Sequence, residues 1–226
     1  MFELILACAF FLGIHLGISG NPGIRARLVN KWGEKAFIVG FATASLTGLV
    51  WMSRAYATAN HIDLWGQLLF LKPLAAISVL IAFILVVTGR TAPNPTIVGQ
   101  GQWLNAGMEP KGIVRITRHP MMWGIVLWAL IHLIINGDLA SVIFFGALML
   151  LALLGTRSID AKRRLAYGEA WRTFERSTSN IPFQAILQGR NRLALSEIGW
   201  RLPLVGVVLF IVFLFLHPWL FGVSAT

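Results

Sequence analysis

Hydrophobic positions along this chain gather into long, nearly uninterrupted runs. Runs of membrane-spanning length fall at residues 2–19, 36–56, 73–89, 120–136, 139–155 and 202–221. Each run is close to the ~20 residues that an α-helix needs to cross a hydrocarbon core. The pattern therefore predicts an all-α, polytopic membrane protein with six transmembrane helices.

Polar and turn-forming residues separate these runs. Asn136, Gly137 and Asp138 are a turn signal, which predicts that the fourth and fifth helices form a tight hairpin. Segment 89–119 contains several prolines and glycines and is predicted to be an irregular loop. Segment 157–180 has a cationic face with interleaved aromatic residues, which predicts an amphipathic helix along the membrane surface.

The distribution of charge orients the predicted helices. The chain is 57% hydrophobic and 12% charged, with a net charge of +10 and a mean hydropathy of +0.73, which is too apolar for an ordinary soluble domain. Of the 19 Lys and Arg residues, 17 fall in segments 20–35, 89–119 and 156–201. The positive-inside rule places these segments in the cytoplasm and both termini on the periplasmic or outer side.

We therefore expect one transmembrane domain, 1–226, with basic cytoplasmic segments 89–119 and 156–201, whose partner is the lipid bilayer. Cations confined to loops argue against nucleic acid as a partner. The first apolar run lacks a positively charged n-region, so we expect it to be retained. Cys8 is the only cysteine, so a metal site within one chain must use nitrogen or oxygen donors.

The five histidines are the main candidates for chemistry, because ionisable groups at membrane depth are costly and usually functional. His15 lies near the inner end of the first predicted helix, while His132 and His217 lie near the outer ends of the fourth and sixth. His119 follows Arg118 at the inner mouth of the fourth helix, and His61 lies in an outer loop. The structural alternative is a hydrogen bond to a neighbouring helix, worth about 1 kcal/mol.

Two pairs of these histidines suit the axial positions of a haem. His15 and His132 differ in depth by ~13 Å from the helical rise, which fits two ligands on opposite faces of a porphyrin parallel to the membrane. His132 and His217 lie at similar depth and would hold the ring upright. The sequence leaves both pairings open.

A set of motifs spread from Leu12 to Pro218 resembles the NnrU family, which includes the ζ-carotene isomerases of plants and cyanobacteria. The motifs are Gly112-Ile-Val-Arg-Ile-Thr-Arg-His-Pro120, Trp128 to His132, Asp160, Tyr167-Gly-Glu-Ala-Trp171, Thr178 to Phe183, Arg201-Leu-Pro203 and His217-Pro218. The resemblance implies a multi-pass protein that carries haem b and isomerises a cis double bond of a polyene. In denitrifying bacteria the family is associated with nitrite and nitric oxide reduction.

Carried over by motif, the haem and metal ligands of the isomerase branch correspond to His15 and His132, while His61 and His119 match other histidines of the pattern. The chain has Ala129 where the plant enzyme has a cysteine proposed as an alternative ligand. A ligand switch through cysteine is therefore excluded here. Leu151-Ala152 replaces a His-His pair of the plant enzyme.

A more distant resemblance connects the chain with the isoprenylcysteine carboxyl methyltransferases, which bind S-adenosylmethionine at the cytosolic membrane face. It rests on Arg118-His-Pro120 with Gly124, and on Tyr167-Gly168 followed by Pro182. In this interpretation Arg118 and His119 are cofactor-binding residues, because an arginine captures a carboxylate in bidentate fashion. The paired glutamates of those enzymes are missing, and Asp160 is the nearest substitute.

Three functions remain at this stage. We favour a haem-dependent isomerase-like enzyme of a bacterial inner (cytoplasmic) membrane, whose aromatic-rich bundle leaves room for an extended apolar substrate. The alternatives are a methyltransferase at the cytoplasmic membrane face and a non-catalytic partner of a nitrogen-oxide reductase. The sequence assigns no catalytic residue and no oligomeric state.

Overall fold

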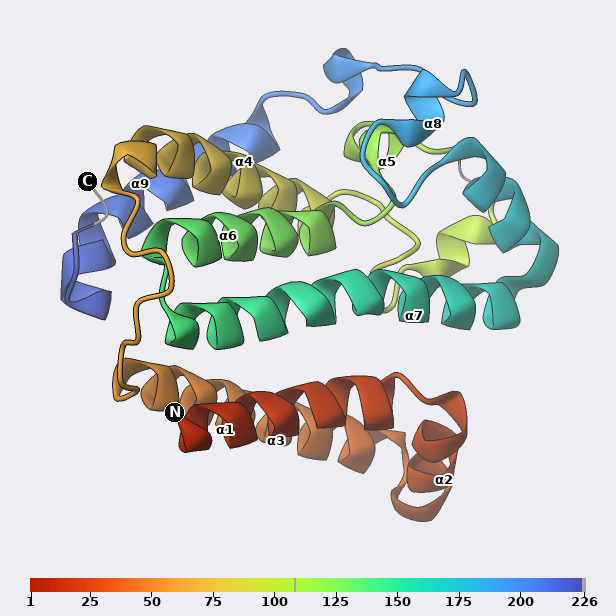
Figure 1. Ribbon diagram of the computed structural model, residues 1–226. Coiled ribbons are helices and arrows are strands. Elements are labelled where there is room, and N and C mark those ends of the chain that lie inside the picture. Colours follow the sequence, from red (N-terminus) through yellow and green to blue (C-terminus); the bar gives the residue numbers. More distant parts are fainter. Residues whose placement is uncertain (108, 225–226) are drawn as a thin grey trace.

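The computed structural model describes residues 1–107 and 109–224, and within them the chain is built from helices (Figure 1). An isolated bridge between Asp63 and Asp138 is the one β-type pairing among these residues. Met108, Ala225 and Thr226, which fall in the expected segment 89–119 and domain 1–226, lie outside the described residues. The predicted all-α class is confirmed.

Five helices are long and apolar enough to cross a membrane. They are α1 with its π-helical continuation η1 (Phe2–Leu12 and Gly13–Ser19), α3 (Glu34–Ala57), η2 with α4 (Leu69–Leu71 and Lys72–Thr91), α7 (Leu139–Ser177) and α9 (Arg201–Phe221). The sixth expected span coincides with α6 (Pro120–Asn136), which is apolar but only 17 residues long. The expected bounds of the apolar runs therefore agree closely with the helices.

Shorter elements connect the long helices. They are α2 (Pro22–Trp32), η3 (Gly101–Leu104), α5 (Ile113–Ile116), α8 (Gln184–Leu187) and η4 (Leu195–Glu197). In α2, Pro22 occupies the first turn and the Asn21 side chain accepts hydrogen bonds from two backbone N–H groups, which is a favourable helix start. The described part of segment 89–119 is irregular between its short turns, as predicted.

One long helix replaces two predicted elements. We expected a membrane span at 139–155 followed by a separate amphipathic helix at 157–180, but α7 runs through both. The polar residues after position 156 include many good helix formers, so no local signal ends the helix there. The helix instead bends at Gly168, whose φ of 50° and ψ of −119° suit only glycine. Beyond this kink the chain turns toward α5 (Figure 1).

The α6–α7 hairpin forms as predicted. Gly137 ends α6 in the left-handed conformation, with φ of 67°, and Asp138 begins α7 by accepting a hydrogen bond from the backbone N–H of Ser141. A Cβ atom at Gly137 would lie 2.0 Å from the carbonyl oxygen of Gly66. Glycine is therefore required both by the turn and by the loop that crosses it.

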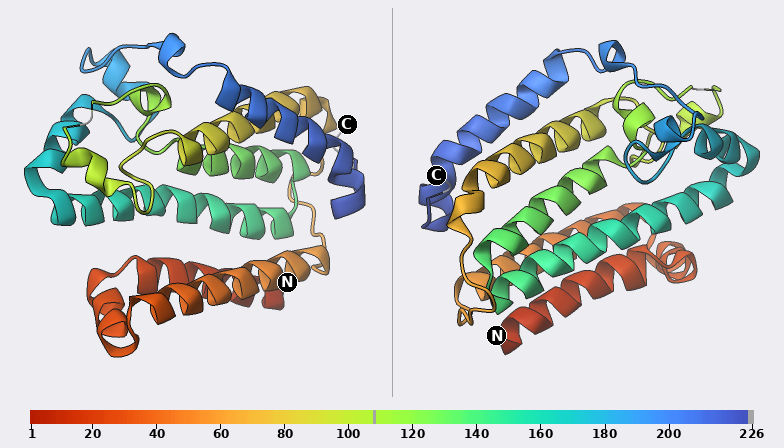
Figure 2. Two further views of the ribbon diagram at one scale, coloured as in Figure 1. Left: turned by 180° about the vertical axis from the view of Figure 1, so that it is seen from behind. Right: turned by 45° about the horizontal axis from the view of Figure 1, so that its top comes forward.

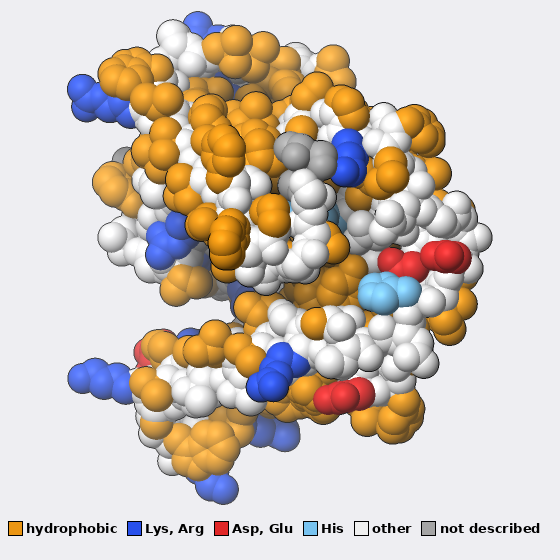
Figure 3. All heavy atoms as spheres, turned by 90° about the vertical axis from the view of Figure 1, so that its left-hand side faces the viewer, with side chains coloured by type: hydrophobic (Ala, Val, Ile, Leu, Met, Phe, Trp, Pro, Cys, Tyr) orange, Lys and Arg blue, Asp and Glu red, His pale blue; other side chains and the backbone are white. Residues whose placement is uncertain are grey.

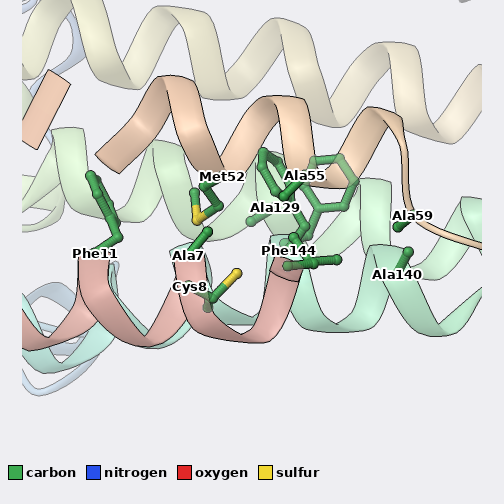
Figure 4. Close-up of a cluster of buried hydrophobic side chains, with 12 residues drawn as sticks. Ala7, Cys8, Phe11, Met52, Ala55, Ala59, Ala129, Ala140 and Phe144 are labelled. Carbon is green, nitrogen blue, oxygen red and sulfur yellow. The ribbon is translucent and has the colours of Figure 1, made fainter. Parts of the chain in front are cut away.

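The long helices run side by side, with α6 between α4 and α7 and with α9 against α4 (Figures 1 and 2). The N- and C-terminal ends lie at the same end of the bundle (Figure 1). The α1–α3 hairpin packs on α7, and together with α6 these helices bury one apolar cluster, called the core cluster (Figure 4). Its members are Leu4, Ala7, Cys8, Phe11, Met52, Ala55, Ala59, Ala129, Ala140, Phe144, Phe145 and Ala147. The many alanines let the helices approach closely.

Candidate functional site

His15 lies in the π-helical turn that continues α1, and such turns are frequent at functional sites. Its Nδ1 atom is 2.8 Å from the carbonyl oxygen of Phe11. The imidazole centroid lies 4.3 Å from the ring of Phe11 and 5.2 Å from that of Phe41 on α3. The half-buried ring is thus held between α1 and α3 by an aromatic pair.

His132 is held in the same way near the C-terminal end of α6. Its Nδ1 atom is 2.8 Å from the carbonyl oxygen of Trp128, one helical turn earlier. Its ring centroid lies 5.1 Å from those of Trp128 and of Phe145 on α7, and it is stacked on the latter. The ring is half-buried and in contact with the core cluster.

The two backbone contacts decide the tautomer of each ring. A carbonyl oxygen only accepts hydrogen bonds, so Nδ1 carries the proton in both histidines and Nε2 keeps its lone pair. Among the described residues neither Nε2 atom has a hydrogen-bond partner. An Nδ1–H bonded to a backbone carbonyl is a common arrangement in metal-binding histidines, because it fixes the ring and the tautomer. The lone pair of each Nε2 atom is therefore available to bind a metal ion.

The fold brings His15 and His132 to one apolar region. Phe11, which touches His15, and Phe145, which touches His132, both belong to the core cluster. The space-filling view shows a notch between the part formed by α1, α2 and α3 and the rest of the molecule, with hydrophobic side chains at its base (Figure 3). His15 and His132 belong to the two parts that border this notch.

The donor set fits a haem better than a bare ion. Within residues 1–107 and 109–224, no three His, Cys, Asp or Glu side chains come together in a way that could hold a metal ion. A porphyrin supplies four nitrogens of its own and needs only one or two axial donors from the protein. The Nε2 atoms of His15 and His132, whose rings contact the apolar core cluster, could supply these donors.

Two further predicted histidines lie on α9 and in the loop after α3. His217 is on α9, which packs on α4, and its ring contacts Phe221 while Nδ1 is 2.8 Å from the carbonyl oxygen of Val223. His61 is exposed in the outer loop, 3.4 Å from a carboxylate oxygen of Asp138. His217 is close enough to His132 to act on it electrostatically, so the pairing of His132 with His15 and its pairing with His217 both stay predictions.

A polar network at the outer end was missed by sequence reasoning. The Asp138 carboxylate accepts a 2.6 Å hydrogen bond from the Ser141 hydroxyl, which lies 2.8 Å from the hydroxyl of Tyr56. The ring of Tyr56 stacks on Phe144 at 4.6 Å, so the network adjoins the core cluster. Tyr56 on α3 and Ser141 on α7 are distant in sequence, and their pairing has no local signal.

Arg118, His119 and Asp160 form a second candidate site, called the inner cluster, at the opposite end of α6 from His132. Arg118 donates from Nη2 and Nε to the Asp160 carboxylate, with the shortest distance 2.6 Å. His119 Nε2 lies 2.7 Å from Asp160 Oδ1. The three side chains are only 8%, 0% and 9% exposed. Charged groups that are this little exposed to solvent require such close pairing.

Neighbouring segments fix the backbone of the inner cluster. The carbonyl oxygen of Arg118 accepts hydrogen bonds from Asn94 Nδ2 at 3.1 Å and from Thr96 Oγ1 at 3.0 Å. The backbone N–H of Arg118 donates to the carbonyl of Ser179 at 2.9 Å. Asn94 and Thr96 lie in the proline-rich loop, and their role was not identified from the sequence. Their alternation with Pro93 and Pro95 was the only available sign of a rigid polar turn.

The inner cluster leaves one polar atom without a partner. The Asp160 carboxylate can only accept, so His119 donates from Nε2, and its Nδ1 is buried without a hydrogen bond. Burial lowers the pKa of His119, against the opposing effect of the hydrogen bond to Asp160. Asp160 thus binds Arg118 and His119, the two side chains that would bind the ligand in the methyltransferase interpretation. The geometry supports a role for Arg118 and His119 in joining the start of α6 to the middle of α7.

Comparisons with known proteins agree with the motifs. The sequence model of a family described as "NnrU protein" matches residues 3–225. The chain is 28% identical over 196 residues to the protein named "15-cis-zeta-carotene isomerase, chloroplastic" of Arabidopsis thaliana, which covers 84% of this chain and 52% of that protein. It is 36% identical over 104 residues to the protein of the same name in Zea mays, which covers 45% of this chain and 28% of that protein.

The chain therefore spans about half the length of one of these relatives and less of the other. No solved structure matches the chain.

Proposed function

The chain belongs to the NnrU family, and we propose that it is a membrane-embedded isomerase that acts on a cis double bond of a long polyene of the ζ-carotene type. Its similarity to two chloroplastic 15-cis-zeta-carotene isomerases supports this substrate class. The structural observation that carries the proposal is the pair of tautomer-fixed imidazoles, His15 and His132, whose rings both contact residues of the core cluster. An apolar polyene would reach this apolar region from the surrounding lipid.

We propose haem b as the cofactor, which Nε2 of His15 and Nε2 of His132 would hold through its iron. When bound, haem would supply an iron centre whose electronic properties depend on these two imidazoles and on the apolar surroundings. The protein orients both rings through the carbonyls of Phe11 and Trp128. Phe145 and the core cluster around it exclude water from the side of the rings that faces the bundle.

We also propose that α6 is a sixth membrane span and that both termini face the outer side of a bacterial cytoplasmic membrane. The 17 residues of α6 measure ~25 Å, slightly less than the ~30 Å of a hydrocarbon core. Its neighbours α4 and α7 are both long enough to span, and both termini lie at one end of the bundle. Alkaline phosphatase fused at either terminus should be active in the periplasm, and activity only in cytoplasmic reporters would refute the orientation.

The isomerase proposal is tested with the full chain in lipid nanodiscs. We expect the wild-type protein from haem-replete cells to show a Soret band and to convert a 15-cis polyene to its trans isomer, as followed by chromatography. His15→Ala and His132→Ala should each lose both properties. His61→Ala is the matched control, because His61 is exposed in a loop beside Asp138. His217→Ala tests the alternative pairing, because His217 is close enough to His132 to act on it electrostatically.

The outcomes separate the two parts of the proposal. A wild-type protein that isomerises the polyene without haem would refute the cofactor and keep the reaction. A haem-loaded protein that leaves the polyene unchanged would refute the reaction and keep the cofactor. Equal losses in His132→Ala and His217→Ala would refute the assignment of His15 as the second ligand. The family's association with nitrite and nitric oxide reduction stays a prediction, tested by co-purification with a reductase from a denitrifying host.

A further inference from the structure

Arginine side chains surround a shallow basin at the end of the bundle opposite the two termini. Its volume is about 540 Å³, and its lining residues are Arg164, Arg172, Glu175, Arg176 and Arg190. Four of these residues lie on the last part of α7, and the fifth follows α8. The basin is therefore a product of the tertiary fold, and neither the haem proposal nor the isomerase reaction uses it.

Arg190 is fixed in place without losing its charge. Its Nη1 atom donates to the backbone carbonyls of Arg176 and Thr178, and its Nε and Nη2 atoms donate to the side-chain oxygen of Gln188. All of these acceptors are uncharged. The guanidinium is thus ordered in advance and keeps its full positive charge at the edge of the basin, which favours capture of an anion.

The other arginines are only partly neutralised. Arg164 donates to Glu175 at 2.7 Å, while Arg172 and Arg176 approach the same Glu169 carboxylate at 3.3 and 3.6 Å. Arg172 and Arg176 are 58% and 75% exposed, so these long contacts contribute little. Four guanidinium groups face two carboxylates, Glu169 and Glu175, which leaves an excess of two positive charges among these six side chains. A phosphate group carries negative charge and several oxygens that can accept hydrogen bonds from such guanidinium groups.

The length of α7 would place the basin near the lipid headgroups if the helix crosses a bilayer. From Leu139 to Gly168 the axis of α7 rises by ~44 Å, and a bilayer with its headgroups is about 40–45 Å thick. After the Gly168 kink, the rest of α7 turns across the end of the bundle and does not continue away from it (Figures 1 and 2). Leu165 and Leu187, in the same two segments, are 79% and 85% exposed. Exposed leucines beside arginines are typical of a membrane interface.

We propose that this arginine basin binds the phosphate of an anionic phospholipid headgroup. Arg190 and Arg164 provide the ordered part of the site, and Arg172 and Arg176 provide mobile cations that close over the phosphate. Glu175 accepts from Arg164 at 2.7 Å and from Arg118 at 3.4 Å, so the basin adjoins the inner cluster. A bound phosphate would compete with Glu175 for Arg164.

Calorimetric titration of the detergent-solubilised full chain with short-chain phosphatidylglycerol tests the proposal. Short-chain phosphatidylcholine and inorganic phosphate form two further arms. We expect phosphatidylglycerol to bind the wild-type protein at least 10-fold more tightly than phosphatidylcholine. The double variant Arg172→Gln/Arg176→Gln should bind phosphatidylglycerol about 30-fold more weakly, as expected for the loss of two cations near an anionic surface.

The matched control is Arg27→Gln/Lys31→Gln, which removes the same charge from exposed positions on α2. This variant should keep the wild-type affinity, and far-ultraviolet circular dichroism should show that both double variants are folded. Binding of inorganic phosphate with the same dependence on Arg172 and Arg176 would support the phosphate site and identify a soluble source. Equal affinities for the two lipids, or equal losses in the two double variants, would overturn the proposal.

Discussion

Replacement of Asp160 by Asn tests the buried ion cluster that joins α6 to α7. Asp160→Asn keeps the volume of the side chain and removes the negative charge that holds Arg118 and His119. Arg118 would retain only Glu175, whose nearest oxygen is 3.4 Å away. Because the Arg118 side chain is 8% exposed, water cannot replace the lost carboxylate without disturbing the packing.

The expected cost follows from this burial. Breaking a buried pair by removing one partner typically costs about 3–5 kcal/mol, and Glu175 compensates in part, so we expect about 3 kcal/mol. For a chain of this length each kcal/mol lowers the melting temperature by about 2–4 °C. Asp160→Asn should therefore melt about 6–12 °C below the wild-type protein.

Thermal unfolding in detergent, followed by circular dichroism, measures this shift. Glu34→Gln is the matched control, because it breaks the Arg25–Glu34 pair, whose side chains are 39% and 64% exposed. That exposed pair contributes at most about 1 kcal/mol. The double variant Arg118→Met/Asp160→Leu should cost less than the sum of the single variants, because it leaves no buried charge without a partner. Asp160→Asn melting within the range of Glu34→Gln would refute the structural role of the cluster.

Two further predictions concern the loops. Gly137→Ala should destabilise the protein by more than ~2 kcal/mol, because φ is 67° and the new Cβ would lie 2.0 Å from the Gly66 carbonyl oxygen. Gly40→Ala is the control, because no atom lies within 4 Å of its new Cβ. Equal melting temperatures of the two variants would contradict the reasoning. The Glu197 carboxylate accepts hydrogen bonds from Arg115 and from the backbone N–H of Gly112, which lowers its pKa from 4.5 to about 2. The contribution of Glu197 to stability should be complete above pH 4.5 and should disappear as the pH falls to about 2. In acid titrations the stability difference between the wild-type protein and Glu197→Gln should therefore shrink over that range. A stability difference that does not depend on pH would refute this prediction.

The helices of this protein could be located from the sequence, because hydropathy is a local property of each run. Pro120 and Gly137 mark the ends of α6 by their own backbone preferences, and the structure places the helix between them. The continuity of α7 from the apolar run into the polar segment could not be recognised in the same way. The chain stays helix-forming after it leaves the apolar run, so the bend at Gly168 is visible only as a backbone conformation.

The candidate site was likewise recognisable from the sequence only in part. His15 and His132 stand out from the sequence because imidazoles within apolar runs are costly, whatever the fold. The sequence left two partners for His132 open, because their positions depend on how α1, α6 and α9 pack. In the structure His15 contacts the core cluster through Phe11, and His217 is close enough to His132 to act on it electrostatically. The hydrogen bonds that fix both tautomers likewise depend on the side-chain rotamers.

Chain composition and hydrophobic period by themselves determined that this protein is a helical membrane protein with histidines inside its bundle. Only the tertiary structure decided that Arg118 is neutralised by Asp160, 42 residues away, and that Arg190 completes a basin at the end of α7. The physical reason is the range of the interactions. Transfer of a segment into lipid is set by that segment alone, whereas the partner of a charge is set by which distant segments pack beside it.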